Sequence, residues 1–437
     1  MRKVYVGLLG CGTVGAGVAK ILLEKNELIQ QRVGAELVLK RVADIDIETD
    51  RGISFPPGVM TTDAELVLSD PEIDIVLEMI GGEGIARKFM LQAIENGKHV
   101  VTANKALLAG DGNAIMEAAA AKGVDLAYEA SCGGCMPIIK TIREALVGNR
   151  IESMIGILNG TCNYILTKIT ADGSTFEDAL AEAKEKGYAE ADPTLDVEGG
   201  DTAHKLAIMT ALASGMAINL DDIYVEGISR ITPLDIQLAG QFGYRIKLLA
   251  IAKNHGDAVE SRVHPTMIPE GNLLSNVGGS LNALLITGDA VGEMILNGHG
   301  AGMMPTASAV VSDIVDIARN ILSGTNGRVP LLSYRPEHIR TIPVLPIDET
   351  ETQYYFRFAA QDQPGVLSKI SGVLGRFGIS LKSVHQKGRE TKGPVSIVML
   401  THRAKEADVK QAMAELTRLD VVTDQPMVIR IEDEDGE

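Results

Sequence analysis

The first 130 residues alternate short apolar runs with helix-length stretches, and this alternation constrains the fold more than any other feature of the sequence. The apolar runs cover residues 4–9, 37–43, 73–79, 99–102 and 124–128, and helices are expected over 15–24, 84–95 and 105–122. Strands that alternate with helices form βαβ units around a parallel sheet. We therefore expect residues 1–130 to form an α/β domain with a parallel sheet.

A glycine-rich turn follows the first predicted strand and begins the first helix. It reads Gly10-Cys11-Gly12-Thr13-Val14-Gly15. In dinucleotide-binding turns the first glycine permits the turn, the second leaves room for pyrophosphate, and the third allows close packing of helix on strand. The amides at the helix N-terminus then face the phosphates. This context predicts a Rossmann-type NAD(P)-binding domain, with cofactor contacts from Gly10, Gly12, Thr13, Val14 and Gly15. The alternative is a glycine-rich turn in an α/β domain without nucleotide.

The residues after the second predicted strand bear on the choice between NAD and NADP. An acid at this point can accept hydrogen bonds from both ribose hydroxyls of NAD, whereas NADP needs a nearby cation for its 2′-phosphate. Asp44 ends the strand, and three further acids follow it by position 50. These charges favour NAD with Asp44 as a ligand. Arg51 could bind a 2′-phosphate, so NADP remains an alternative. The acids could also form a solvated loop that binds no cofactor.

The pattern changes after residue 130, which predicts further domains. Helices are expected over 137–146, 176–186, 201–213 and 306–322, with mixed glycine-rich segments over 222–300. Residues 131–305 are interpreted as a mixed α+β substrate-binding and dimerisation domain, and the helix over 306–322 as packing back on the first domain. A proline-containing linker spans 323–349. Residues 350–431 show the order β-α-β-β-α-β of a ferredoxin-like unit, and residues 432–437 form an acidic, solvated tail.

Two lysines are candidates for proton transfer. Lys105 follows the strand over residues 99–102, at the strand end where ligands bind in open α/β sheets. Asp201 and Lys205 lie four residues apart and share one face of a predicted helix, which continues in apolar residues. A lysine removed from water among acids can donate or accept a proton. The alternatives are a surface lysine that caps a strand at Lys105 and a surface ion pair between Asp201 and Lys205.

Composition excludes several classes of function. The net charge is −17, aromatic residues make up 4% and tryptophan is absent, which argues against a nucleic-acid surface. No apolar run approaches the ~20 residues of a membrane span. Four cysteines are too few for a disulfide scaffold and suit a reducing compartment. We therefore expect a cytoplasmic protein with no nucleic-acid or membrane partner.

Several motifs together resemble homoserine dehydrogenase over residues 3–330. They are the glycine turn, Thr102-Ala103-Asn104-Lys105, Tyr128-Glu129-Ala130-Ser131, residues 158–164 (LNGTCNY), residues 187–205, Gly300-Ala301-Gly302 and Pro305-Thr306-Ala307-Ser308. Residues 353–431, with Asp362-Gln363-Pro364-Gly365-Val366-Leu367, resemble an ACT domain. The resemblance implies an NAD(P)-dependent oxidoreductase that interconverts L-homoserine and L-aspartate 4-semialdehyde, on the route to threonine, methionine and isoleucine.

The resemblance also implies roles for individual residues. Lys205 would give or take the hydroxyl proton, and Lys105 would polarise the carbonyl beside the nicotinamide. Glu190 and Asp201 would hold the substrate ammonium. The remaining implied positions are Gly160, Thr161 and Tyr188 in the substrate pocket, and Gly187 and Gly302 at the cofactor.

Two further properties follow from the resemblance, and a third follows from the sequence itself. A monovalent cation, Na⁺, would bind at Glu129, Cys132, Gly134 and Met136, mostly through backbone carbonyls. An amino-acid effector, with threonine as the leading candidate, would bind the ACT domain at Asp362, Gly365, Val366 and Leu367. The glycine-rich segment over 222–300 is expected to support a homodimer or homotetramer.

Some residues depart from the family pattern and keep alternatives open. Cys132 and Cys135 form a C-x-x-C pair, which suggests a regulatory disulfide or two inert thiols. His299 replaces the usual residue beside Gly300, and Ser380 stands where many ACT domains have Asn. The ACT domain could then serve only for dimerisation. The histidines lack the spacing of zinc ligands. The rival functions are another amino-acid dehydrogenase and a ligand sensor with an inactive dehydrogenase core.

Overall fold

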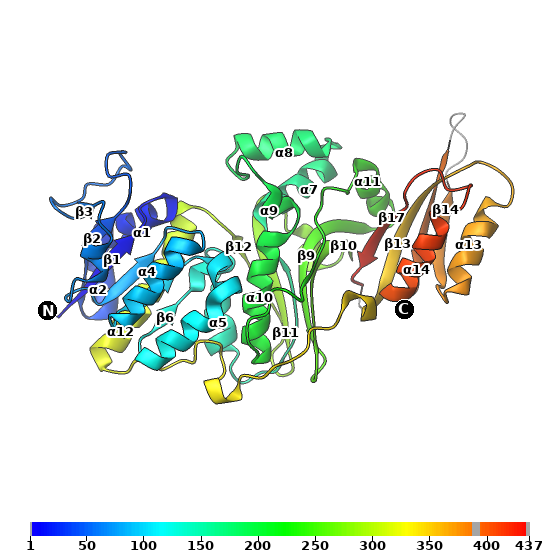
Figure 1. Cartoon of the computed structure of the whole chain (residues 1–437). Coiled ribbons are helices and arrows are strands. Elements are labelled where there is room, and N and C mark those ends of the chain that lie inside the picture. Colours follow the sequence, from blue (N-terminus) through cyan, green and yellow to red (C-terminus); the bar gives the residue numbers. More distant parts are fainter. Residues whose placement is uncertain (1, 387–393, 434–437) are drawn as a thin grey trace. The chain divides into compact units, whose positions relative to one another are not determined.

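The computed structural model describes residues 2–386 and 394–433 (Figure 1). Within them the chain divides into two compact units. The first unit contains the residues up to Gly160, then 201–223 and 280–342. The second unit contains residues 161–200 and 224–279, and the chain from Pro343 onward. Each unit is described by itself below.

The first unit contains the predicted parallel sheet. Its strands are β1 (Lys3–Leu9), β2 (Glu36–Ala43), β3 (Met60–Thr61), β4 (Ile75–Glu78), β5 (His99–Thr102) and β6 (Leu126–Ala127). They lie in the order β3-β2-β1-β4-β5-β6, and every neighbouring pair is parallel. This is the strand order of a dinucleotide-binding fold, in which the carboxyl ends of β1 and β4 flank the point where the order reverses. The predicted Rossmann-type fold is confirmed.

Helices connect these strands and cover the sheet. They are α1 (Thr13–Glu24), α2 (Asn26–Val33), α3 (Glu65–Leu68), α4 (Gly84–Glu95) and α5 (Lys105–Lys122). A late helix, α12 (Met303–Ser323), packs against α1 and joins the same core. The two helices come so close that a Cβ on Gly17 would lie 2.8 Å from the carbonyl oxygen of Met303.

The rest of the first unit carries an antiparallel sheet and one buried helix. Strands β7 (Ile151–Ile157), β11 (Leu281–Gly288) and β12 (Gly292–His299) pair antiparallel, with β11 in the middle. Helix α10 (Gly200–Ser214) is buried along almost its whole length. The helix expected over 137–146 is instead a short α-helix, α6 (Ile138–Lys140), followed by a π-helical turn, η2 (Thr141–Ala145). A short 3₁₀ turn, η1 (Glu129–Ser131), precedes it.

The second unit contains the predicted ferredoxin-like order. Strand β13 (Glu351–Ala360) is followed by α13 (Val366–Arg376), β14 (Leu381–Gln386), β15 (Val395–Thr401), α14 (Glu406–Leu416) and β17 (Met427–Ile431). Strand β13 pairs antiparallel with β15 and β17, and both helices pack on a core of aromatic residues such as Phe356 and Phe358. The remaining elements of this unit are α7 (Gly160–Asp172), α8 (Phe176–Glu185), α9 (Thr194–Val197), β8 (Tyr224–Val225), α11 (Pro233–Gln241), β9 (Tyr244–Asn254), β10 (Val259–Pro269), η3 (Leu273–Asn276), η5 (Ile347–Glu349) and β16 (Ala404–Lys405).

The end of β17 differs from the solvated tail that the acidic sequence suggests. Strand β17 pairs in parallel with β10, which carries Glu432 into the interior, where it is 7% exposed. Its carboxylate accepts hydrogen bonds from Arg262 and from Lys253, the latter at 2.7 Å. The expectation of a solvated residue is therefore wrong for Glu432, because two cations far away in sequence compensate its charge. Residues 434–437 of the expected tail lie outside the described residues.

Among the described residues, no helix is both long enough and apolar enough to cross a membrane.

Candidate active site

The glycine turn between β1 and α1 has the geometry that the sequence predicts. Gly10 has φ +89°, and a Cβ there would lie 2.7 Å from backbone atoms of Met79. A Cβ on Gly15 would lie 2.0 Å from the carbonyl oxygen of Gly10, so only glycine fits beneath the turn. A Cβ on Gly12 would meet nothing within 4 Å. The turn is thus closed by Gly10 and Gly15, and it is open at Gly12 and at the start of α1, where a pyrophosphate can approach.

Asp44 lies directly against this turn. Its carboxylate accepts hydrogen bonds from the backbone N–H groups of Cys11 and Asp46. Arg51 contacts the same place, because its Nε donates to the Cys11 carbonyl at 2.6 Å and its Nη2 lies 3.5 Å from Asp44 Oδ1. The acid expected for NAD and the cation that kept NADP open are therefore side by side.

The first unit brings both candidate lysines onto one buried carboxylate. Lys205 Nζ donates to Asp201 Oδ2 at 2.6 Å, and Lys105 Nζ lies 3.2 Å from Asp201 Oδ1. Asn159 Nδ2 donates to Asp201 Oδ2 at 2.9 Å, and the Leu158 carbonyl accepts from Lys205 Nζ at 2.6 Å. Asp201 and Lys205 are 5% and 8% exposed, whereas the side chain of Lys105 is 33% exposed. The i,i+4 pair is therefore not a surface ion pair.

Charge balance decides the protonation state of Asp201. Burial opposes ionisation, but the charges of Lys205 and Lys105, with the hydrogen bonds from Lys205 and Asn159, hold the pKa of Asp201 well below its usual range. The cluster thus holds one carboxylate and two ammonium groups. Its net positive charge suits a site where an oxygen of the substrate gains negative charge.

A chain of hydrogen bonds positions Lys105 at the start of α5. The Asn104 side chain caps the helix by accepting from the N–H of Leu107, and the Asn104 N–H donates to Thr102 Oγ1 at 3.0 Å. Thr102 in turn donates to the carboxylate of Glu78, at the end of β4, at 2.7 Å. Glu78, Thr102 and Asn104 are all buried. The position of Lys105 is therefore fixed by the carboxyl ends of two adjacent strands.

The expected substrate residues Thr161, Tyr188 and Glu190 lie in the second unit. Thr161 Oγ1 donates to the carbonyl of Tyr188 at 2.6 Å and contacts the Asp196 carboxylate at 3.3 Å. The Tyr188 ring lies 5.0 Å from that of Tyr164, and Tyr188 is 44% exposed. Glu190 is exposed, as is Gly187, which has φ +72°. Thr161 and Tyr188 are thus joined by contacts within this unit, whereas Glu190 faces solvent.

Two expected glycine positions lie in the first unit. A Cβ on Gly160 would lie 2.8 Å from the carbonyl oxygen of Ser280, so the chain there allows only glycine. Gly302 has φ +126° and precedes α12, and its carbonyl accepts from the N–H of Thr306 at 3.0 Å. The backbone therefore requires glycine at both positions, independently of any ligand contact.

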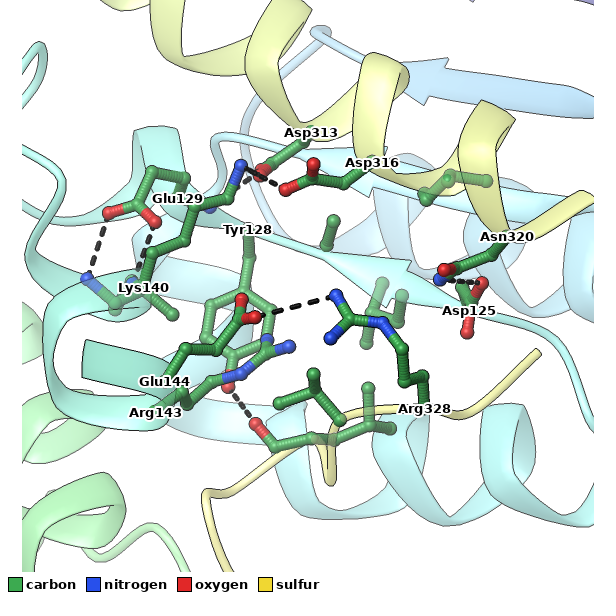
Figure 2. Close-up of a pocket in the computed structure, with 16 residues that line it drawn as sticks. Asp125, Tyr128, Glu129, Lys140, Arg143, Glu144, Asp313, Asp316, Asn320 and Arg328 are labelled. Carbon is green, nitrogen blue, oxygen red and sulfur yellow. Dashed lines mark hydrogen bonds and ion pairs between the residues drawn. The ribbon is translucent and has the colours of Figure 1, made fainter. Parts of the chain in front are cut away.

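The residues expected at the cation site surround a buried carboxylate. Glu129 accepts hydrogen bonds from the N–H groups of Ile139 and Lys140, both at 2.8 Å, and its own N–H donates to Asp313 at 2.8 Å (Figure 2). Lys140 Nζ lies 3.3 Å from Asp313 Oδ1 and also pairs with Asp316. Burial and the nearby charge of Asp313 raise the pKa of Glu129 to about 7. The cluster of Glu129, Asp313, Asp316 and Lys140 thus has more carboxyl groups than cations.

The other expected cation residues lie in a closely packed segment. Cys132 is fully buried, and burial raises the pKa of its thiol to about 12. A Cβ on Gly134 would lie 2.5 Å from the Gly300 carbonyl, and the Met136 carbonyl accepts from the N–H of Ile138 at 2.8 Å. Cys132 and Cys135 are both free, with Cys135 exposed. In the part of the chain that the structure describes, no three His, Cys, Asp or Glu side chains are grouped to hold a metal.

Comparisons with known proteins agree across the whole chain. Family models match residues 10–129 (homoserine dehydrogenase, NAD binding domain), 137–315 (homoserine dehydrogenase) and 354–421 (ACT domain). The chain is 45% identical to the homoserine dehydrogenases of Neisseria gonorrhoeae, over 432 residues, and Pseudomonas aeruginosa, over 433 residues, with 99% of each chain covered. The crystal structure of a homoserine dehydrogenase from Thiobacillus denitrificans superposes with a TM-score of 0.94 at 46% identity, covering 99% of both chains.

The chain belongs to the homoserine dehydrogenase family.

Membership confirms the resemblance stated from the motifs. The chain is an oxidoreductase with homoserine dehydrogenase activity, a nicotinamide-cofactor domain and an ACT domain. A hyperthermophilic archaeal homoserine dehydrogenase mutant, solved in complex with NADPH, superposes with a TM-score of 0.61 at 26% identity, covering 75% of this chain and all of that one.

The ACT domain places the expected effector residues at the start of α13. Gly365 has φ +89° and its carbonyl accepts from the N–H of Lys369 at 3.0 Å. Val366 is buried in the domain core, whereas Leu367 is 39% exposed. Asp362 precedes this turn and is half-buried. The left-handed conformation of Gly365 lets the chain turn into α13.

Sequence reasoning missed four residues of the site. Asn159 was visible only as part of the motif over residues 158–164, with no role attached to it. Thr102 and Asn104 were visible only as part of the motif Thr102-Ala103-Asn104-Lys105, with no role attached to them, and nothing in the sequence links Glu78 to Lys105. A buried acid at the end of β4 was the available signal, since buried carboxylates need hydrogen-bond partners.

Proposed function

We propose that Lys205 is the proton donor and acceptor of the reaction and that Lys105 polarises the substrate carbonyl. The observation that supports this is the shared carboxylate: Asp201 binds both lysines within 3.2 Å in a nearly buried cluster. The cofactor, when bound, supplies or accepts the hydride. In the reduction direction the Lys205 ammonium gives a proton to the substrate oxygen, and in the oxidation of L-homoserine the neutral Lys205 amine takes the hydroxyl proton. Lys105 stabilises the oxygen as its charge changes.

Asp201 orients the two lysines, and its contact with the substrate ammonium remains a prediction. Glu190, which is exposed and has an ionisable carboxylate, is proposed to bind that ammonium. Thr161, Tyr188 and Gly160 are proposed to line the substrate pocket, and Gly187 and Gly302 to contribute to the cofactor site. These assignments rest on the family motifs, and the Thr161–Tyr188 hydrogen bond brings two of these residues together.

We propose that the cofactor is NAD in preference to NADP. Asp44 lies against the glycine turn and can accept ribose hydroxyls, whereas Asp44 and Asp46 would repel a 2′-phosphate. Arg51 is already engaged by both acids and by the Cys11 carbonyl. Its charge is therefore largely compensated.

A monovalent cation, Na⁺, is proposed beside Glu129. Glu129 and Asp313 are both buried, the Glu129 N–H donates to Asp313, and Lys140 pairs with Asp313. A cation held by Glu129 and the carbonyls of Cys132, Gly134 and Met136 would balance this charge, since carbonyl and carboxylate oxygens suit hard cations.

Regulation, assembly and location complete the proposal. The ACT domain is proposed to bind an amino-acid effector, with threonine first, at Asp362, Gly365, Val366 and Leu367. The chain is proposed to form a homodimer or homotetramer. The cysteines are free, which agrees with a reducing compartment, and we propose the cytoplasm.

The role of Lys205 is tested with Lys205→Ala. Turnover of L-homoserine is expected to fall by about 10²–10⁴, the range for loss of a general acid or base. NAD binding, measured by titration calorimetry, is expected to be unchanged. Lys122→Ala is the matched control, because Lys122 pairs with Glu95 at the far end of α5. Full activity in Lys205→Ala would show that the proton is carried elsewhere.

A further inference from the structure

Strand β11 carries one buried polar side chain that no assignment above uses. Asn282 is 1% exposed and lies in the otherwise apolar run Leu281-Asn282-Ala283-Leu284. Among the residues that the structure describes, neither Oδ1 nor Nδ2 of the Asn282 amide has a hydrogen-bond partner. An unpaired polar group inside a protein lowers its stability, and asparagine is disfavoured in strands. The fold alone therefore gives no reason for an asparagine at this position.

The amide of Asn282 lies directly against the segment that leads into α12. A Cβ on Gly300 would lie 2.0 Å from Asn282 Nδ2 and 2.5 Å from Asn282 Oδ1, so only glycine at position 300 leaves room for the amide. Gly134 presses on the same residue, since a Cβ there would lie 2.5 Å from the Gly300 carbonyl oxygen. Two residues after Gly300 stands Gly302, which is proposed at the cofactor site. Asn282 is thus packed against the segment expected to contact the cofactor.

The same amide approaches the segment expected to contact the substrate. A Cβ on Gly160 would lie 3.7 Å from Asn282 Oδ1. The two residues before Gly160 hold the catalytic cluster, because one accepts a hydrogen bond from Lys205 and the other donates one to Asp201. Asn282 is therefore adjacent both to the segment that holds the cluster and to the segment that begins α12.

Hydrogen bonds that form only in the reacting complex favour the reaction, whereas bonds already present in the ligand-free chain do not. The amide of Asn282 can donate two hydrogen bonds and accept two. The glycine segments beside it carry backbone N–H and carbonyl groups, and a small shift of either segment would bring such groups to the amide. We propose that Asn282 is a positioning residue, whose amide hydrogen-bonds to the backbone of the Gly160 and Gly300 segments when substrate and cofactor are bound. This inference rests on the proposed function, which places Gly160 at the substrate and Gly302 at the cofactor.

A positioning role of this kind has opposite effects on stability and on activity. In the ligand-free chain the unpaired amide of Asn282 only lowers stability, so an apolar side chain of the same shape should be tolerated or should stabilise the fold. In the reacting complex the same replacement removes the hydrogen bonds that position the two segments. A purely structural role would instead lower stability and activity together.

The test compares Asn282→Leu with the wild type, because leucine has the branched shape of asparagine without its polar atoms. For L-homoserine oxidation, kcat/KM is expected to fall by about 10- to 100-fold, the loss expected for two hydrogen bonds. The midpoint of thermal unfolding, followed by circular dichroism without ligands, is expected to stay the same or to rise by up to about 4 °C.

Asn149→Leu is the matched control. Asn149 lies beside Gly288 at the far end of β11, and its Oδ1 accepts a hydrogen bond from the Val291 N–H at 2.8 Å. Because this amide is already paired in the ligand-free chain, its replacement should lower the midpoint of thermal unfolding and leave kcat/KM unchanged.

A second variant, Asn282→Ala, allows for crowding by the methyl groups of leucine against Gly300. It adds no atoms, and its kcat/KM is expected to fall by about tenfold or more at a temperature where circular dichroism shows it folded. Wild-type kcat/KM in either folded variant would overturn the proposal and leave the proposed function standing. Loss of activity together with a lower midpoint in both variants would indicate a structural role and would overturn it as well. A wild-type chain that does not oxidise L-homoserine would contradict the proposed function, and this inference with it.

Discussion

Glu432 is expected to secure strand β17 through its buried charge, and Glu432→Gln tests this. Arg262 and Lys253 outweigh the cost of burial and lower the pKa of Glu432 from 4.5 to about 2. A shift of this size corresponds to about 3 kcal/mol of stability. Removing one partner of a buried ion pair costs about 3–5 kcal/mol, which agrees. Glutamine keeps the shape of the side chain and removes the charge.

The sign of the pH dependence follows from the lowered pKa. The stabilising contribution is fully present above the unfolded-state pKa of 4.5, and it disappears as the pH falls toward about 2. The Glu432→Gln variant lacks this contribution at every pH. The difference between the two proteins should therefore be largest near neutral pH and should close between pH 4.5 and 2.

Amide hydrogen exchange at β17 measures this contribution locally, which suits a chain with two compact units. At pH 7, about 3 kcal/mol corresponds to exchange roughly 100-fold faster in Glu432→Gln. The control is Glu415→Gln, since Glu415 forms an exposed pair with Arg376, and such pairs are worth about 0–1 kcal/mol. Exchange within threefold of the wild type at pH 7, or a difference that does not change with pH, would refute the reasoning.

Three further variants test the cofactor and catalytic assignments. Lys105→Ala should lower kcat for L-homoserine by about 10² or more, with NAD affinity within a few-fold of the wild type; an unchanged kcat would remove Lys105 from the mechanism. Asp44→Ser should lower the ratio of kcat/KM for NAD over NADP by about tenfold, the effect of one charge-assisted hydrogen bond, and an unchanged ratio would show that Asp44 does not read the ribose. Gly15→Ala should abolish NAD binding in calorimetry, because its Cβ would lie 2.0 Å from the Gly10 carbonyl oxygen, and normal binding would mean that the turn can relax.

Local patterns were enough to predict the parallel sheet and the order of the ACT domain. Helices α4 and α5 have the expected bounds of 84–95 and 105–122, because buried faces with 3.6-residue periodicity and short polar connections specify them. Strands β9 and β10 were not distinguished within 222–300. They carry buried charged residues such as Lys247 and Arg262, and a polar residue in an apolar run hides a strand when its partner is distant in sequence.

Local sequence patterns also predicted part of the site, but not the contacts between residues that are distant in sequence. The spacing of Asp201 and Lys205 predicted a shared helix face, but it could not show burial, and it could not bring in Lys105 from 96 residues away. The resemblance assigned Asp201 to the substrate ammonium, whereas the structure shows both of its oxygens in contact with lysines. The prediction that Glu432 is solvated was wrong for a related reason. The cations that compensate its charge come from β9 and β10, which are distant in sequence. Long-range charge compensation leaves no periodic pattern in a sequence.

The most direct test of the account is the initial rate of L-homoserine oxidation by the purified chain, with NAD and NADP measured side by side. The account predicts that the unmodified chain oxidises L-homoserine, and that kcat/KM is higher with NAD than with NADP. A higher kcat/KM with NADP would keep the reaction and contradict the assignment of Asp44. No turnover with either cofactor, from protein shown by circular dichroism to be folded, would contradict the central claim that the Lys105–Asp201–Lys205 cluster is a working active site.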